Sequence, residues 1–346
     1  MLIKEWGVMG QTKIGINGFG RIGRNAFKIA FERSDIEIVA INDIADIKAL
    51  AYLLEHDSNY GTYHYEIKIS DDGIIVNGKN IKVLRQGEPL NIPWGELGVE
   101  VVIESTGYFT SQSDAQRHLT AGAKRVVISG PNADESVNTI VLGVNEDNSD
   151  KDNLIISCAS PTTNAIGALL AILDGEFSVQ KSLLTTIHSY TSNQSLVDKP
   201  SDNLREGRSA AENIVPSTTG AVASIQKVLP QLAGKFDGLS LRIPTAVVSL
   251  ADVTVLLGHP ATVDEINALI SKSADLPFYQ GILGVSNEQL VSRDFIGNSF
   301  SGIVDLPLTK VVGGNLAKIM IWYDNEWGYS NRLVEIVADT GRSLHI

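Results

Sequence analysis

The sequence predicts an α/β protein with two domains, a doubly wound parallel sheet followed by an α+β domain with a largely antiparallel sheet. Three observations support this fold class. The chain has 346 residues, which is about two domains at roughly 150 residues each. Residues 1–160 alternate apolar strand patterns with helical patterns, whereas later residues alternate apolar and polar side chains with period two. Strands with continuous apolar runs are typical of parallel sheets, and alternating strands of antiparallel ones.

The first part of the chain contains apolar runs separated by amphipathic segments. We expect strands at residues 12–17, 36–42, 100–105, 125–129 and 153–157, and helices at 21–33 and 112–121. Strands of this kind between helices predict a parallel sheet that is covered on both faces.

The second part of the chain has a different pattern. Residues 239–243 and 251–255 each place apolar side chains at every second position, so we expect strands whose apolar row is buried. Helices are expected over residues 209–228 and 263–273 and should cover that face. The polar, turn-rich stretch Val197–Arg208 is predicted to be a long functional loop.

Composition excludes several classes of function. The chain has 28 Lys and Arg against 40 Asp and Glu, a net charge of −12, so we expect no general binding to nucleic acid or anionic membranes. The single cysteine, Cys158, excludes an internal disulfide and a cysteine-rich zinc site, and no metal is expected. A single cysteine suits a reducing compartment, so we expect a cytoplasmic protein. Residues 1–11 lack a signal-peptide pattern, and no long apolar run predicts a membrane span.

Gly18, Gly20 and Gly23 form a GxGxxG pattern between a predicted strand and a predicted helix. Gly18 permits a tight turn, Gly20 lets the backbone approach a pyrophosphate, and Gly23 lets the helix pack closely. The helix N-terminus binds the anion. Asp43 follows about twenty residues later, can accept bonds from ribose hydroxyls and would repel a 2′-phosphate. The pattern therefore favours NAD over NADP, and a glycine turn without a ligand is the weaker alternative.

Two further segments are ambiguous by themselves. Residues 157–164 (SCASPTTN) join a strand to an apolar helix expected at 165–173. The hydroxyls there can bind an anion, but plain helix capping explains them better. His188 follows another predicted strand, and a lone histidine is more often structural than catalytic.

Nine motifs occur in order along the chain. They are INGFGRIGR (16–24), IND (41–43), ESTGxF (104–109), SxASxTTN (157–164), TIHSYTxxQ (186–194), LRxGR (204–208), STTGA (217–221), LRxPT (241–245) and WYDNEWGYSNR (322–332). From Lys13 onward the chain resembles phosphorylating, NAD-dependent glyceraldehyde-3-phosphate dehydrogenase. The erythrose-4-phosphate dehydrogenases share most of these motifs, so the aldehyde stays open between a triose and a tetrose phosphate.

The resemblance implies an organisation and an activity. Residues 1–160 would form the NAD-binding domain, to which a helix at 326–346 returns, and residues 161–325 the substrate domain. The activity would convert glyceraldehyde 3-phosphate and inorganic phosphate to 1,3-bisphosphoglycerate with reduction of NAD, in glycolysis. It also implies a cytoplasmic homotetramer in which the loop Val197–Arg208 lines the cofactor site of a neighbouring subunit.

The resemblance also implies roles for individual residues. His188 matches the base that activates the nucleophile, and Thr191 and Arg242 match the site for the substrate phosphate. The residues that match the site for the attacking phosphate are Ser160, Thr162, Arg205, Thr219 and Gly220. The residues that match the cofactor site are Asn17, Gly18, Gly20, Arg21, Ile22, Gly23, Asp43, Ser129 and Asn325.

One departure from the family pattern concerns the nucleophile. The family has a cysteine where this chain has Pro161, and a proline side chain has no lone pair with which to attack an aldehyde. Cys158 lies three residues upstream, so we expect it to face the other way and to be a small buried side chain. Proline suits the first turn of a helix. Two hypotheses follow: a dehydrogenase with an impaired covalent step, or a catalytically silent NAD- and phosphate-binding protein with a regulatory or scaffolding role.

Overall fold

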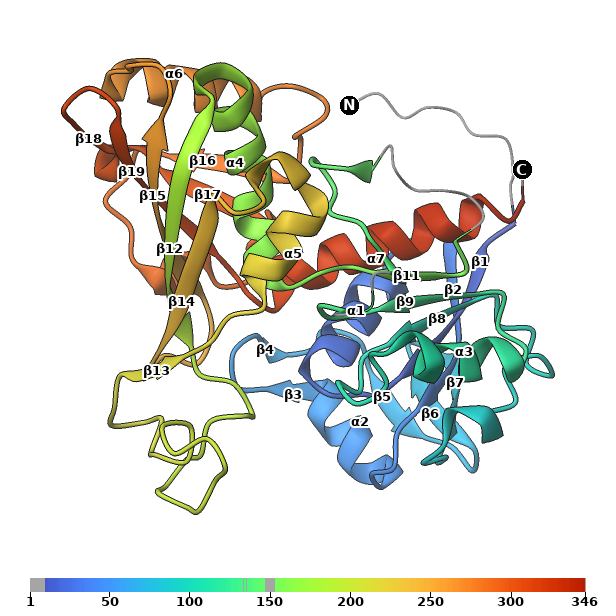
Figure 1. The fold of residues 1–346 in the computed structure, drawn as a ribbon. Coiled ribbons are helices and arrows are strands. Elements are labelled where there is room, and N and C mark those ends of the chain that lie inside the picture. Colours follow the sequence, from blue (N-terminus) through green and yellow to red (C-terminus); the bar gives the residue numbers. More distant parts are fainter. Residues whose placement is uncertain (1–9, 133, 135, 147–152, 346) are drawn as a thin grey trace. The chain divides into compact units, whose positions relative to one another are not determined.

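The computed structural model describes residues 10–132, 134, 136–146 and 153–345, and Figure 1 gives its fold. Contacts divide the chain into two compact units. Unit 1 contains residues 1–138, 149–158 and 333–346, and unit 2 contains residues 139–148 and 159–332. Residues 1–9, which belong to the stretch without a signal-peptide pattern, lie outside the described residues, as does residue 346 of the expected C-terminal helix.

Unit 1 is built on a sheet with the strand order β10-β11-β9-β8-β1-β2-β7-β6-β5. The strands are β1 (Thr12–Asn17), β2 (Ile36–Asn42), β5 (Ile67–Ile69), β6 (Gly73–Val76), β7 (Lys79–Leu84), β8 (Val101–Glu104), β9 (Arg125–Ile128), β10 (Asn138–Thr139) and β11 (Ile155–Ser157). From β11 to β7 all neighbours are parallel. This order, with β1 in the middle and later strands added on both sides, is that of a doubly wound dinucleotide-binding sheet, so the predicted fold of this part is confirmed.

The helices of unit 1 are α1 (Arg21–Phe31), α2 (Ile47–Glu55) and α3 (Gln112–Thr120), and β3 (His56–Asp57) pairs with β4 (Gly61–Thr62) beside the main sheet. The chain runs from β1 to β2 on one side and continues at β8 on the other side of β1. The carboxyl ends of β1 and β8 therefore form the topological switch point, where such folds bind ligands.

Unit 2 contains the second large sheet, with the order β13-β14-β12-β15-β19-β17-β16 and β18 paired to β19. Its strands are β12 (Val179–Ser189), β13 (Val215–Ser217), β14 (Phe236–Ile243), β15 (Ser249–Leu257), β16 (Leu283–Ser286), β17 (Gly302–Asp305), β18 (Lys310–Val312) and β19 (Leu316–Tyr323). Most neighbours are antiparallel, as predicted, but β12 and β14 are parallel, as are β16 and β17.

Helices α4 (Pro161–Phe177), α5 (Ala221–Val228) and α6 (Val263–Ala274) pack on this sheet, and Figure 1 shows α4 and α5 beside β12 and β14. Their apolar side chains and those of one sheet face form a continuous buried core. The last helix, α7 (Trp327–Arg342), begins in unit 2 and ends in unit 1.

Two details of the prediction for unit 2 are wrong. The helix expected over 209–228 is limited to Ala221–Val228, and Val215–Ser217 is instead the edge strand β13. Pro216 explains part of this difference, because it lacks an amide hydrogen and fits an edge strand better than a helix interior.

The second wrong detail is the buried face of β14. Ser240 is buried, whereas Leu239 is 46% exposed. Gly238 pairs with the buried Leu184 of β12, so the face covered by helices carries Gly238 and Ser240. The predicted apolar row of Leu239, Leu241 and Ile243 lies on the opposite face, because side chains alternate along a strand. In β15 the predicted row of Ala251 and its alternate neighbours is buried, as expected.

No helix in the described ranges is long and apolar enough to cross a bilayer. In the same part of the chain, no three His, Cys, Asp or Glu side chains are grouped so that they could hold a metal ion.

Candidate active site

The glycine pattern forms a tight turn between β1 and α1 in unit 1. Gly18 has a φ of +89°, and a Cβ on it would lie 2.6 Å from the amide nitrogen of Thr106. A Cβ on Gly23 would lie 2.1 Å from the carbonyl oxygen of Gly18, whereas the space around Gly20 is open. Helix α1 begins after Gly20 without a side-chain cap. Its first amides and the open space at Gly20 fit an anion such as a pyrophosphate.

Asp43 follows β2 and contacts the glycine turn. One carboxylate oxygen accepts a hydrogen bond from the amide of Phe19 at 2.7 Å, and the other accepts from Ala45 at 2.9 Å. Each oxygen has a second lone pair, so the carboxylate can still accept bonds from ribose hydroxyls. Next to the turn, Arg21 donates to Asp57 at 2.6 Å.

The other predicted cofactor residues of unit 1 differ in accessibility. Ile22 and Ser129 are half-buried, and the amide of Ser129 donates to the carbonyl of Glu104. Asn17 is buried, and its side chain donates to Glu104 and accepts from Asn42. The Asn17 side chain therefore supports the turn, and the backbone carbonyl oxygen of Asn17 accepts from the amide and the hydroxyl of Ser105.

In unit 2, Pro161 is the first residue of α4, so the proline lies in the first turn as expected, and the helix begins before the expected residue 165. Ser160 is the N-cap, and its hydroxyl accepts a hydrogen bond from the amide of Thr163 at 3.1 Å. The missing amide hydrogen of Pro161 is not needed at this position. The structure thus accommodates the proline, but its hydrocarbon ring provides no nucleophile at the start of the helix.

Cys158 belongs to unit 1 and is fully buried at the end of β11. Its amide donates to the carbonyl of Ile128 at 3.0 Å. The expected small buried side chain is confirmed, and this environment is not that of an activated thiol, which is partly exposed and electropositive.

Tyr323, at the end of β19, connects α4 to the sheet of unit 2. Its hydroxyl lies 2.9 Å from that of Thr162 and 2.9 Å from that of Thr186. Tyr323 is buried, and burial raises its pKa. The sequence analysis missed this residue, although it lies two positions before Asn325 in the WYDNEWGYSNR motif.

His188 lies on β12 with its ring against the edge of the Tyr323 ring. Its Nδ1 is 2.7 Å from the carbonyl oxygen of Ser189 and 2.5 Å from Nη1 of Arg242 on β14. Burial, and then the neighbouring guanidinium, lower the pKa of His188 to about 3. His188 is therefore neutral near pH 7, the state in which an imidazole can accept a proton.

Asn325 is held by two buried serines at the ends of neighbouring strands. Its Oδ1 accepts hydrogen bonds from Ser189 at 2.9 Å and from Ser249 at 3.1 Å. The amide orientation follows from these donors, because a hydroxyl bonded to Oδ1 leaves Nδ2 to donate elsewhere. Val248, just before Ser249, has a φ of +70°, a strained conformation for a β-branched residue.

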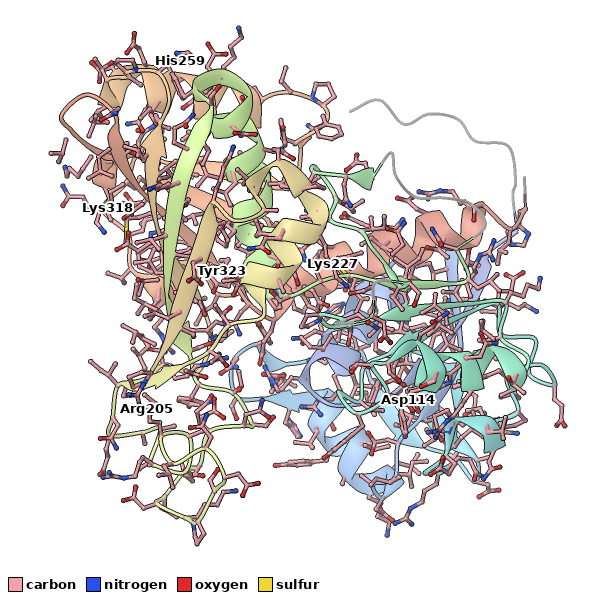
Figure 2. All side chains as sticks on the ribbon, in the orientation of Figure 1. Asp114, Arg205, Lys227, His259, Lys318 and Tyr323 are labelled. Carbon is pink, nitrogen blue, oxygen red and sulfur yellow. The ribbon has the colours of Figure 1, made fainter. Side chains whose placement is uncertain are left out.

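The remaining predicted residues lie on loops of unit 2. Thr191 donates through its amide and hydroxyl to Gln194, and the hydroxyl of Thr219 accepts from the amide of Ala221 just after the N-cap Gly220 of α5. Arg205 is exposed on the loop predicted at Val197–Arg208, which contains no helix or strand. Figure 2 labels Arg205 on this loop and Tyr323 beside the sheet. Within the described contacts, none of the Thr191, Arg205 and Thr219 side chains hydrogen-bonds to His188 or Arg242.

Comparisons with known proteins agree with this architecture. The family model "Glyceraldehyde 3-phosphate dehydrogenase, NAD binding domain" matches residues 12–112, and the model "Glyceraldehyde 3-phosphate dehydrogenase, C-terminal domain" matches residues 157–325. The chain is 48% identical over 329 residues to glyceraldehyde-3-phosphate dehydrogenase 1 of Bacillus cereus, covering 95% of this chain and 98% of that relative.

Two other relatives give the same result. Identity is 48% over 334 residues to glyceraldehyde-3-phosphate dehydrogenase of Streptomyces coelicolor, with 96% and 99% of the two chains covered. It is 46% over 328 residues to that of Geobacillus stearothermophilus, with 94% and 97% covered. With its NAD-binding fold and its second, largely antiparallel domain, this chain belongs to the glyceraldehyde-3-phosphate dehydrogenase family.

Proposed function

We propose that unit 1 is the NAD-binding domain of this chain and unit 2 its substrate domain. The first amides of α1 would hold the pyrophosphate at Gly20, and Asp43 would accept the ribose hydroxyls. The observation that carries this assignment is the uncapped helix start beside open space at Gly20. NAD, when bound, supplies the acceptor for a hydride. Asp43 would disfavour a 2′-phosphate and so select NAD over NADP.

The substrate would be glyceraldehyde 3-phosphate, with inorganic phosphate as the second reactant, in the glycolytic reaction. Arg242 and Thr191 would bind the phosphate of the substrate. Ser160, Thr162, Arg205, Thr219 and Gly220 would bind the attacking phosphate. The guanidinium and amide donors at these positions would bind a small anion despite the net negative charge of the whole chain, because a few local donors suffice. Neutral His188 would take the proton of the nucleophile.

Pro161 occupies the position at which the family resemblance implies the nucleophilic cysteine. Because a proline ring cannot form a covalent adduct with an aldehyde, the covalent step would be strongly impaired. The retained polar framework of Ser160, His188 and Arg242 favours descent from an active dehydrogenase. The missing nucleophile favours the second candidate, a catalytically silent NAD- and phosphate-binding protein with a regulatory or scaffolding role.

A turnover assay separates these two candidates. NADH formation is measured with glyceraldehyde 3-phosphate, NAD and phosphate, and in parallel with erythrose 4-phosphate. We expect NAD binding by calorimetry together with very slow or no turnover. Turnover at a rate typical of enzymes, about 1–1000 per second, would contradict the assignment of Pro161 to the nucleophile position. Calorimetry that shows equal or tighter binding of NADP would contradict the cofactor preference.

We also propose that the chain forms a homotetramer in the cytoplasm. The outer face of the unit 2 sheet carries apolar side chains that are exposed in the single chain, among them Leu183 at 63% and Leu239 at 46%. An exposed apolar sheet face is typical of a protein interface. The absence of internal disulfides, which follows from a single cysteine, suits a reducing compartment. Light scattering should report a tetramer at micromolar concentration, and a monomer would refute this proposal.

A further inference from the structure

The ESTG motif at residues 104–107 places a buried carboxylate at the switch point of the unit 1 sheet. Glu104 ends β8 and pairs in register with Asn17, which ends β1. Its side chain is fully buried. A carboxylate in such a place is costly unless hydrogen bonds satisfy it, so its partners define what it does.

Four hydrogen-bond donors surround the Glu104 carboxylate. Oε1 accepts from the amide of Thr106 at 2.8 Å and from the hydroxyl of Thr106 at 2.5 Å. Oε2 accepts from Nδ2 of Asn17 at 2.6 Å and from Nε2 of His118 at 3.0 Å. A carboxylate has about four lone-pair sites, so these donors fill its acceptor capacity.

The proton on His118 is fixed by its other neighbour. His118 is fully buried, and its Nδ1 is 2.9 Å from Nε1 of Trp94. An indole N–H only donates, so Nδ1 must be the acceptor. Nε2 therefore carries the ring proton and donates to Glu104.

The amide orientation of Asn17 is fixed in a similar way. Its Oδ1 accepts from Nδ2 of Asn42 at 2.8 Å. Oδ1 of Asn42 in turn accepts from the backbone amide of Gln86 at 2.8 Å. A backbone amide cannot become an acceptor, so neither side-chain amide can reverse without placing donor against donor. At the other oxygen the Thr106 amide is equally fixed, so the donors from Asn17, His118 and Thr106 all require acceptor oxygens at residue 104.

These contacts hold the two turns of the switch point together. The hydroxyl of Ser105 donates to the carbonyl of Gly18 at 2.8 Å, and the amide of Gly18 donates to the carbonyl of Asn42 at 2.8 Å. Gly18 packs so closely on Thr106 that no Cβ would fit. Glu104 therefore orders the segment that contains Ser105 and Thr106, and the glycine turn packs against that segment.

We propose that Glu104 is a positioning residue for the dinucleotide, and that His118 helps to orient it. The carboxylate sets the geometry of the turn at Gly18 and of the turn at Thr106, and thereby the direction of the amides that receive the pyrophosphate. This inference rests on the proposed binding of NAD in unit 1.

The first test compares NAD affinity with stability in Glu104→Gln. This change preserves shape but points an amide N–H at donors that cannot reverse. We expect the dissociation constant for NAD, measured by calorimetry well below the unfolding temperature, to rise about tenfold to a hundredfold. The matched control is Thr340→Val, which removes the buried hydrogen bond from Thr340 to Ile336 in the same unit. We expect it to lower the unfolding temperature and to leave the NAD affinity unchanged.

The second test uses two substitutions of His118 and does not depend on the folding of Glu104→Gln. A glutamine can accept from Trp94 and donate to Glu104, whereas a phenylalanine can do neither. We expect His118→Gln to bind NAD nearly as the parent does and His118→Phe to bind at least tenfold more weakly.

The outcomes separate this inference from the function on which it rests. Absence of NAD binding by the parent would overturn both. Parental affinity in a folded Glu104→Gln, or equal affinity in the two His118 variants, would overturn the positioning role alone and leave Glu104 a structural residue.

Discussion

The glycine turn of unit 1 and the start of α4 in unit 2 are both helix N-termini that follow a strand, but they differ in what their chemistry requires. The turn offers backbone amides, and its side-chain requirements are the absence of a Cβ at Gly18 and Gly23, the open space at Gly20 and the carboxylate of Asp43. At α4 the proposed covalent reaction would require one particular side chain, the thiol that the family resemblance implies, and Pro161 would not supply it. Binding built from backbone is robust to most substitutions, whereas nucleophilic chemistry can be lost through one.

The start of α4 also shows why such a loss need not disturb the fold. Ser160 caps the helix, and the hydroxyl of Tyr323 connects Thr162 to the sheet. Neither contact uses the side chain of residue 161. Because the first amide of a helix has no intrahelical partner, proline is tolerated there. The reactive group and the framework around it are therefore physically separable.

The largest expected effect comes from Pro161→Cys. A thiol there would lie at a helix N-terminus in a unit that retains His188 as a base, conditions that lower a thiol pKa. We expect NADH formation to increase by up to about a million-fold, by analogy with the loss of nucleophiles in hydrolases. The control Pro161→Ala should bind NAD and remain inactive. A folded cysteine variant that binds NAD without turnover would favour the silent binding protein.

The next effect concerns the pH dependence of stability. The pKa of His188 is lowered from about 6.5 to about 3 in the folded protein. Between these values the unfolded chain binds a proton that the folded chain does not, so this contribution to stability is lost as the pH falls. The change is about 5 kcal/mol over that whole range, of which about 3 kcal/mol falls between pH 7 and pH 4. Urea unfolding at pH 7 and pH 4 of the parent and of His188→Gln measures it. Identical pH dependence in the two proteins would show that the His188 pKa is not depressed.

The glycine turn predicts a contrast between two alanine substitutions. Gly23→Ala would place a methyl group against the carbonyl of Gly18, and we expect a loss of about 1–3 kcal/mol in the free energy of unfolding. Gly20→Ala meets no atom of the protein, so stability should hardly change, while NAD affinity falls because the methyl group occupies the proposed pyrophosphate space. Denaturation and calorimetric titration of both variants check this. Unchanged NAD affinity in Gly20→Ala would remove the pyrophosphate from that position.

The smallest effect is expected from Asp43→Asn. The Nδ2 group of the new asparagine would face the backbone N–H of either Phe19 or Ala45, which places one donor against another. The charge that repels a 2′-phosphate would also be lost. We expect NAD affinity to fall about tenfold and the preference over NADP to shrink. Asp46→Asn is the control, since Asp46 caps α2 nearby and contacts the amide of Lys48. If both variants keep the preference of the parent, Asp43 does not select the cofactor.

Local patterns allowed much of the fold to be predicted. The alternation of strands and helices in residues 1–160 predicted the doubly wound sheet, and the proline at residue 161 predicted a helix start. The alternation in β14 predicted a strand but the wrong buried face, because Gly238 and Ser240 carry too little apolar surface to mark the helix-covered side. Residues 209–220 were wrongly assigned to a helix, since the pairing of Val215–Ser217 with β14 is not visible in the local pattern.

By itself, the sequence determined the fold class, the glycine turn, the burial of Cys158 and the lack of a nucleophilic side chain at Pro161. These follow from side-chain chemistry and from conformational preferences that act over a few residues. Only the tertiary structure decided that Glu104, His118 and Asn17 form one network and that Tyr323 joins Thr162 to Thr186. Such residues are far apart in the chain, and their hydrogen bonds exist only because the fold brings strand ends and helices together and burial removes the competing water.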